Sequence, residues 1–374
     1  MPVTPPDAAA LAAHSLRLIT GLQTPEGAYP ASPSFSAYRG YCWFRDGAFI
    51  ADAASAAGEI ASAERFFDWC ARVLVARADH IRWIVAESEA GRPPAAERML
   101  PARYTFSGDD GADEWWDFQL DGYGTWLWAL RAHAERHGTD LSRWADAVEL
   151  TVDYLVASWQ RPCYDWWEEH AMHVHVSTLA CVAAGLDAAR PQLSGARAER
   201  AATSSAAIVE LMRTEGTLDG RLRKWLGSTA VDGSLAAAIA PLEVIPATSP
   251  LGAETIRVLE AHLTVDGGVH RFLGDTFFGG GQWPLLTCFL GLAQLAAGDR
   301  ARAQELFTWA ASTATDDLDL PEQVPGHLIA PGMRQEWIDR WGTVATPLLW
   351  SHAMLLRLGL ALDLFTPDSL KDPR

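Results

Sequence analysis

The sequence has little that would place it in a membrane, on a nucleic acid or outside the cell. Its longest apolar stretch, WPLLTCFLGLAQLAAG at 283–298, is interrupted by polar residues and is too short to span a bilayer. The N-terminus lacks the basic and apolar segments of a secretory signal. Basic residues are outnumbered, because 30 Lys and Arg stand against 47 Asp and Glu and give a formal net charge of −17. That charge repels phosphate backbones and anionic membranes and favours a small neutral or cationic ligand.

Cysteines are few and show no pairing pattern. They are odd in number and include no CxxC pair, and they stand at Cys42, Cys70, Cys163, Cys181 and Cys288. Neither a disulfide framework nor a zinc site is indicated by this arrangement. We therefore expect buried thiols in a cytoplasmic protein. The expected oligomeric state is a monomer or a homodimer.

Alternation of apolar and polar residues with a period of two is also scarce, and HVHVST at 173–178 is its main candidate. Helical periodicity is common instead. It predicts helices at 7–21, 47–57, 59–76, 125–135, 141–158, 177–186, 196–212, 234–242, 252–262, 285–297, 301–312 and 348–364. The sequence therefore predicts an all-α protein.

The predicted helices alternate between two kinds. One kind is apolar on nearly all sides and must be surrounded, whereas the other is apolar on one side and can lie at the surface. Five or six such pairs favour an (α/α)6 barrel that occupies residues 1–374 as a single domain. The aromatic loops that precede the inner helices would then converge at one end and form a pocket. A solenoid of helical hairpins is the alternative, although no repeat recurs at fixed spacing.

Two adjacent carboxylates follow two indoles in the run at 164–170, YDWWEEH. Burial beside aromatic rings disfavours the ionised form of a carboxyl group and raises its pKa, which suits a general acid. Glu168 and Glu169 both qualify. A simple charge at a helix N-terminus is the structural alternative for Glu168.

Other motifs supply polar groups and aromatic rings suited to a sugar. Arg45 and Asp46 offer donors and an acceptor for vicinal hydroxyl groups, unless they only form a salt bridge that caps a helix. Indoles pack against sugar C–H surfaces, although each is as commonly part of a core. Among the 17 tryptophans, the candidates for a sugar site are Trp43, Trp115, Trp116, Trp166, Trp167 and Trp350.

Two further patterns are discounted. His170, His173 and His175 are not spaced as the HExxH of a helical zinc site, so no metal is expected. The three glycines at 279–281 lack the Lys-Ser or Lys-Thr that follows a phosphate-binding loop. No cofactor is expected either.

The ordered set of motifs resembles glucoamylase-like enzymes, which form glycoside hydrolase family 15. The motifs that carry the resemblance are WFRD at 43–46, QLDGYG at 119–124, DWWEE at 165–169, HR at 270–271, DTFFGG at 275–280, PEQ at 321–323 and LWSH at 349–352. The resemblance covers residues 22–364. It implies an (α/α)6 barrel and exo-acting, anomer-inverting release of glucose from non-reducing ends.

Residue roles follow from the same resemblance. It implies that Glu168 is the general acid and Glu322 the general base, and inversion requires roughly 6.5–9.5 Å between their carboxyl groups. A solvated loop position is the alternative for Glu322. The resemblance also implies that Arg271 donates to the sugar and that Glu169 contacts the substrate beyond the cleaved bond.

The expected substrate is a short oligosaccharide. Neither an N-terminal β-rich domain nor a starch-binding module is recognisable, which favours isomaltose and other α-1,6-linked glucosides over α-1,4 maltodextrins and trehalose. Trp166 and His170 are expected to narrow the acceptor side. A sugar epimerase and a non-catalytic sugar-binding protein on the same barrel remain as alternatives of other classes.

Overall fold

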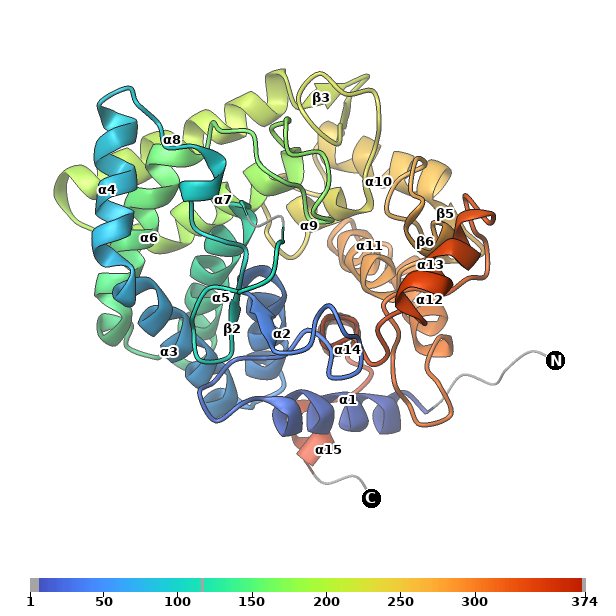
Figure 1. Cartoon of the computed structure of the whole chain (residues 1–374). Helices are drawn as coiled ribbons and strands as arrows, with labels where there is room; N and C mark the ends of the chain where they lie inside the picture. The colour runs from blue at the N-terminus through green and yellow to red at the C-terminus, as the bar shows by residue number, and fades with distance from the viewer. Residues whose placement is uncertain (1–6, 116–117, 372–374) are drawn as a thin grey trace.

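Two concentric layers of helices make up the protein (Figure 1). The computed structural model describes residues 7–115 and 118–371. Within them, the inner helices are α2 (Phe44–Ala56), α5 (Asp121–His137), α7 (Val176–Ala189), α9 (Ala236–Ile239), α11 (Pro284–Ala296) and α14 (Leu349–Ala361). The outer helices that pair with them are α1 (Ala8–Leu22), α3 (Ile60–Ala76), α6 (Ala145–Ser158), α8 (Gly195–Thr214), α10 (Pro250–Leu263) and α12 (Arg300–Ser312).

The inner helices form a closed ring. Each packs against the next along the chain, and α14 returns to pack against α2. The outer helix α1 also lies against α14, so the first and last parts of the chain meet (Figure 1). The (α/α)6 barrel predicted from the sequence is therefore confirmed.

Burial follows the two predicted patterns of apolar residues. Every residue of α11 from Pro284 to Gln294 is buried, as expected for a helix surrounded on all sides, whereas α3 buries one face only. The closest packing in the inner ring is between α5 and α7. A Cβ on Gly185 would lie 2.4 Å from the carbonyl oxygen of Gly124, so only glycine allows these two helices to touch.

Strands are short and lie at the edges of the helical layers. Three antiparallel two-stranded ribbons are described, of which β1 (Tyr41–Trp43) and β2 (Arg103–Thr105) pair with Cys42 opposite Tyr104. The others are β3 (Thr217–Leu218) with β4 (Arg221–Leu222), and β5 (Thr264–Val265) with β6 (Gly268–Val269). The short alternating stretch at 173–178, the main candidate for a strand, forms none, because α7 already begins at Val176 and His175 makes only an isolated bridge to Trp225.

Most predicted helices are confirmed, with shifts at their ends. Helix α2 begins three residues earlier than expected, so Arg45 and Asp46 lie in its first turn, and α5 likewise begins at Asp121. The predicted helix at 234–242 is shorter, and the one at 141–158 opens with a 3-10 turn, η2 (Ser142–Trp144). Helices α4 (Ala78–Glu89), α13 (Met333–Trp341) and α15 (Pro367–Lys371) were not expected, nor were the short turns η1 (Ala96–Arg98), η3 (Arg190–Gln192), η4 (Gly233–Leu235) and η5 (Phe277–Gly279).

All five cysteines have buried, free thiols. Among the described residues, no helix has the length and apolar character needed to cross a bilayer.

Candidate active site

A cavity of about 560 Å³ opens where the loops before several inner helices converge. Its wall is strongly aromatic and carries both acids and bases. The lining residues are Ala31, Phe35, Ala37, Tyr38, Trp43, Arg45, Asp46, Glu114, Trp115, Trp166, Trp167, Glu168, Glu169, Arg271, Phe277, Trp283, Glu322, Trp337, Arg340, Trp341, Leu348 and Trp350. The predicted convergence of the motif loops at one end of the barrel is therefore confirmed.

Glu168 lies in a tight turn between α6 and α7. Its backbone adopts a φ of 60°, the left-handed region that non-glycine residues rarely occupy. The indole Nε1 of Trp43 donates a hydrogen bond of 2.7 Å to its Oε1. Burial raises the pKa of Glu168 to about 7, against the opposing effects of Arg45 and of the Trp43 hydrogen bond. A carboxyl group with this pKa holds a proton near neutrality.

Glu322 lies in the loop before α14 and is 2% exposed, which excludes the alternative of a solvated loop acid. Tyr38 donates a hydrogen bond of 2.7 Å to its Oε1, whereas its buried Oε2 has no hydrogen-bond partner among the described residues. Burial raises the pKa of Glu322 to about 7, and the charge of Glu168 raises it further, while Tyr38 and Arg271 oppose this. One oxygen of Glu322 is thus held by Tyr38, and the other has no hydrogen-bond partner among the described residues.

Arg45 and Asp46 stand at the start of α2 and line the same cavity. Arg45 Nη1 donates to Gln119 Oε1 at 2.6 Å and to Asp121 Oδ2 at 3.2 Å, so its main partners come from the QLDGYG motif rather than from Asp46. The Arg45 Nη2 to Asp46 Oδ2 distance is 3.4 Å, and this oxygen makes no hydrogen bond. Burial raises the pKa of Asp46 to about 6. The pair is therefore more than a helix-capping salt bridge.

Arg271 and Glu169 form the opposite side of the cavity. Arg271 is fully buried, and its Nε donates to Asp275 Oδ2 at 2.8 Å. Its Nη2 lies 3.7 Å from Glu169 Oε2, which has no hydrogen-bond partner among the described residues. Like Glu168, Glu169 is only partly buried, and burial raises its pKa while Arg271, rather than Arg45, opposes the shift. The two adjacent acids thus have different environments.

Five of the six predicted tryptophans line the cavity: Trp43, Trp115, Trp166, Trp167 and Trp350. The sixth, Trp116, lies outside the described residues. Trp166 also packs in the core, with its ring 5.5 Å from that of Trp350. Packing and cavity lining are therefore not exclusive for these rings.

Several lining residues escaped the reading of the sequence. Tyr38 stands in a turn-rich loop without a motif, and Trp283 directly precedes α11. Trp337 and Trp341 are four residues apart on α13, a spacing that puts both indoles on one helix face. The spacing of these two tryptophans in the sequence could have indicated an aromatic helix face. No local signal marked Tyr38, because its role depends on Glu322, 284 residues away.

His170 is not among the lining residues, so its expected place on the acceptor side is wrong. Its ring instead faces Trp225, at 4.9 Å between centroids, and its Nδ1 lies 3.3 Å from Asp165 Oδ2. His173 stacks on the same indole. Within residues 7–115 and 118–371, no group of His, Cys, Asp and Glu is arranged to hold a metal ion.

A toroid of paired helices in which two carboxylic acids, Glu168 and Glu322, line one aromatic cavity is the arrangement typical of a glycoside hydrolase. The model of the family "Glycosyl hydrolases family 15" matches residues 6–276. The chain belongs to this family and is an O-glycosyl hydrolase.

Relatives match along nearly the whole chain. The isomaltose glucohydrolase of Kribbella flavida is 52% identical over 364 residues, covering 96% of this chain and 94% of that protein. A solved glycosidase in complex with glucose superposes with a TM-score of 0.94 at 51% identity, covering 96% of this chain and 98% of the other. A bacterial glucoamylase complexed with acarbose is similar in fold, with a TM-score of 0.72 at 21% identity, over 96% of this chain and 57% of the other.

Proposed function

We propose that this protein is an exo-acting, anomer-inverting α-glucosidase that releases glucose from the non-reducing end of short α-1,6-linked glucosides. One observation carries the proposal: Glu168 and Glu322, both with a pKa that desolvation raises to about 7, line one cavity together with the Arg45–Asp46 pair. Inversion in one step requires one protonated and one ionised carboxyl group on opposite sides of the sugar.

Glu168 is the general acid and Glu322 the general base in this proposal. A base must offer a free lone pair to water, and Glu322 Oε2 has no hydrogen-bond partner among the described residues. Tyr38 holds the other oxygen and so orients the carboxylate. Glu168, whose pKa desolvation raises to about 7, protonates the glycosidic oxygen as the bond breaks. The expected separation of roughly 6.5–9.5 Å between the two carboxyl groups stays a prediction.

Arg45, Asp46 and Arg271 bind the hydroxyl groups of the terminal glucose. Asp46 Oδ2 makes no hydrogen bond in the cavity wall, so it is available as an acceptor. The indole Nε1 atoms of Trp350 and Trp283 likewise lack hydrogen-bond partners in the described part of the chain and line the cavity. Indoles supply both apolar faces and single donors, which suits a sugar ring.

A small acceptor fits the far side of the cavity. Helix α13 contributes Trp337, Arg340 and Trp341 to the lining, and Phe277 packs against Trp337. The Phe277 ring lies 4.9 Å from the Arg271 guanidinium, so these side chains narrow the cavity near Arg271 and favour a single sugar there over a long chain. The similarity to an isomaltose glucohydrolase supports the α-1,6 preference. Cleavage of α-1,4 maltodextrins or of trehalose is the second candidate, because the same groups bind the terminal glucose for each linkage.

Hydrolysis of isomaltose, maltose, nigerose, kojibiose and trehalose, followed by NMR of the anomeric protons, tests the proposal. We expect β-glucose as the first product and the fastest turnover on isomaltose. Release of α-glucose would overturn the inverting mechanism. No glucose from any of the five would support a sugar-binding protein, and conversion of the sugar without hydrolysis would support an epimerase.

We also infer a cytoplasmic site of action and a monomer or homodimer. Five scattered free cysteines support a reducing compartment. A chromatographic mass measurement tests the oligomeric state.

A further inference from the structure

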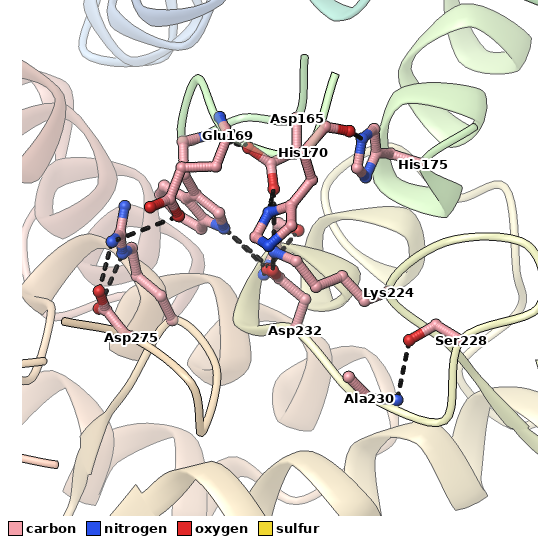
Figure 2. A network of polar contacts seen from close by, with 12 residues as sticks. Asp165, Glu169, His170, His175, Lys224, Ser228, Ala230, Asp232 and Asp275 are labelled. Atoms are coloured by element: carbon pink, nitrogen blue, oxygen red, sulfur yellow. Dashed lines mark hydrogen bonds and ion pairs between the residues drawn. The ribbon is translucent and has the colours of Figure 1, made fainter. Parts of the chain in front are cut away.

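Beneath the turn at 165–170 lies a buried cation between two buried carboxylates (Figure 2). Lys224 is 2% exposed, and its Nζ lies 3.0 Å from Asp165 Oδ2 and also forms a hydrogen bond with Asp232 Oδ2. Both carboxyl side chains are 3% exposed. None of the three residues lines the cavity, so the cluster acts through its neighbours.

The Asp165 carboxylate organises the turn that carries Glu168. Its Oδ1 accepts backbone hydrogen bonds from Trp167 at 3.0 Å and from Glu169 at 2.9 Å. The Asp165 main chain closes the same turn, because its carbonyl accepts from Glu168 N and its N–H donates to the Glu169 carbonyl. With Oδ1 occupied by the turn, Oδ2 faces Lys224. The ammonium group thereby fixes the position and charge of the carboxylate that shapes the turn.

The turn needs such support because its backbone is strained. Glu168 has a φ of 60° and His170 a φ of 56°, and left-handed conformations of non-glycine residues cost roughly 1 kcal/mol or more each. They persist only where surrounding interactions hold them. A strained turn released from Asp165 would relax to a more extended backbone and carry the Glu168 carboxyl away from the cavity.

Asp232 holds a different part of the site. Its oxygens lie 3.0 Å and 3.2 Å from the indole Nε1 of Trp167, a wall of the cavity. Its Oδ1 also accepts from the backbone N and the Oγ of Ser234, which anchors it to the turn before α9. Lys224 therefore joins two supports, one for the proposed acid and one for the sugar-facing indole.

The identity of the cation is itself informative. The chain contains two lysines, Lys224 and Lys371, among 30 basic residues, so arginine serves at nearly every other position. A guanidinium group is broad and planar, whereas an ammonium group is compact and fits between two carboxylates. Lys224 also lies 3.9 Å from the centroid of the Phe272 ring, which closes the cluster on that side. The space favours a compact charge.

We propose that Lys224 is a positioning residue that holds the turn of Glu168 through Asp165 and the indole of Trp167 through Asp232. The inference rests on the proposed role of Glu168 as general acid. Removal of the ammonium leaves two buried carboxylates without their common counter-charge, which strongly disfavours the present arrangement. Glu168 then no longer meets the glycosidic oxygen.

Leaving-group dependence separates positioning of the acid from general structural damage. Isomaltose has a poor leaving group that needs a proton, whereas α-glucosyl fluoride has a good one that needs little acid assistance. We expect Lys224→Met to lower kcat on isomaltose about 100-fold, because small misplacements of catalytic groups have effects of this size. The loss on α-glucosyl fluoride should be less than about tenfold. Lys371→Met is the matched control and should change neither value.

Lys224→Arg keeps the positive charge, and it tests the positioning role of Lys224 if the Lys224→Met variant does not fold. It should show the same leaving-group pattern with smaller losses. Asp232→Asn should instead raise KM for both substrates alike, because it loosens Trp167 while Lys224 still pairs with Asp165. Equal losses of kcat on both substrates for the Lys224 variants would overturn the inference.

The Glu168→Gln variant keeps this test distinct from that of the proposed function. We expect it to lose far more activity on isomaltose than on the fluoride. Equal losses there would overturn the acid assignment itself. A selective loss for Glu168→Gln without one for Lys224→Met and Lys224→Arg would overturn only the role of Lys224.

Discussion

The turn that carries Glu168 and the loop that carries Glu322 face the same cavity, yet different interactions hold them. The Glu168 turn rests on charge, in the cluster of Asp165, Lys224 and Asp232. The Glu322 loop rests on neutral hydrogen bonds. Its own N–H donates to the Ala345 carbonyl at 2.9 Å.

Helix α14 supplies most of the neutral support. Ser351 Oγ donates to the Pro321 carbonyl at 2.9 Å, and the N–H of Leu320 donates to His352 Nε2 at 2.9 Å. The latter bond requires an unprotonated Nε2, so Nδ1 carries the proton and donates to Ser15 Oγ at 2.8 Å. Burial, helped by His14, lowers the pKa of His352 to about 3, which keeps this ring neutral.

The difference has an energetic consequence. Removing one member of a buried ion cluster strands a charge, which costs several kcal/mol, whereas losing one neutral hydrogen bond costs about 1 kcal/mol. The strained turn of Glu168 needs the stronger restraint. The two sides of the site should therefore differ in their sensitivity to substitution.

The largest expected effect is that of replacing the two glutamates themselves. Glu168→Gln and Glu322→Gln should each lower kcat on isomaltose by roughly a thousandfold, the usual scale for general acid–base catalysis. Glu322→Gln should lose activity on α-glucosyl fluoride as well, because water attack needs the base for either leaving group. Glu199→Gln on the exposed side of α8 is the control. Full activity in both variants would refute the mechanism.

The same substitutions should stabilise the protein at alkaline pH. The pKa of Glu322 is raised from 4.5 to about 7, so the folded state binds its proton more tightly than the unfolded state. The resulting stability is present below pH 4.5 and is lost as the pH rises through 7. Since Gln does not ionise, Glu322→Gln should unfold with a free energy about 3 kcal/mol higher than the parent at pH 8.

Urea denaturation at pH 8 and at pH 4.5 measures this gain. The gain should be small at pH 4.5, where the folded parent is protonated too. A gain of the same size at both pH values would show that ionisation is not its source.

The pH dependence of kcat/KM should distinguish the two sides of the site. Activity falls below the pKa of the base and above that of the acid, so both limbs should lie near neutrality. The Tyr38 hydrogen bond lowers the pKa of Glu322. Tyr38→Phe should therefore move the acidic limb to higher pH and cost about tenfold in kcat/KM for each unit moved. Trp43→Phe should instead move the alkaline limb to higher pH, because the Trp43 hydrogen bond lowers the pKa of Glu168. If Tyr38→Phe moved the alkaline limb and Trp43→Phe the acidic limb, the acid and base roles of the two glutamates would be reversed.

The smallest expected effect is that of removing one neutral hydrogen bond that holds the Glu322 loop. Ser351→Ala removes the hydrogen bond to Pro321 and should cost about 1–2 kcal/mol of stability. It should lower kcat only a few-fold and leave KM unchanged. Ser312→Ala removes a similar hydrogen bond at an exposed site and serves as the control in urea denaturation. A loss of kcat as large as that of Lys224→Met would erase the contrast between the two loops.

Local patterns predicted much of this protein because they are local in origin. The wholly apolar segment of α11 must be surrounded, and the one-sided α3 must lie outside it. Helix α4 was missed because its apolar residues are sparse, and only Ile81 and Ile84 are buried in it. The alternating stretch at 173–178 formed no strand, because a period of two over a few residues is easily overridden by packing.

Site residues divide in the same way. Glu168 stood out by its adjacent indoles, and burial there raises its pKa as those neighbours suggested. Tyr38 and Lys224 did not stand out, because no neighbouring residue in the sequence indicates their partners. Tyr38 contacts Glu322, and Lys224 contacts Asp165 and Asp232, only in the folded chain. His170 was misplaced because the geometry of the turn brings its ring against Trp225, and it is not among the residues that line the cavity.

The sequence by itself determined the helical periodicity, the alternation of inner and outer helices, and the set of acids and indoles carried before the inner helices. Tertiary structure alone decided which oxygen of each acid is hydrogen-bonded, which rings face the cavity, and which buried charges compensate one another. The physical reason is that hydrophobic periodicity acts within a few turns of chain. Burial, pKa and ion pairing instead depend on groups that only closure of the barrel brings together.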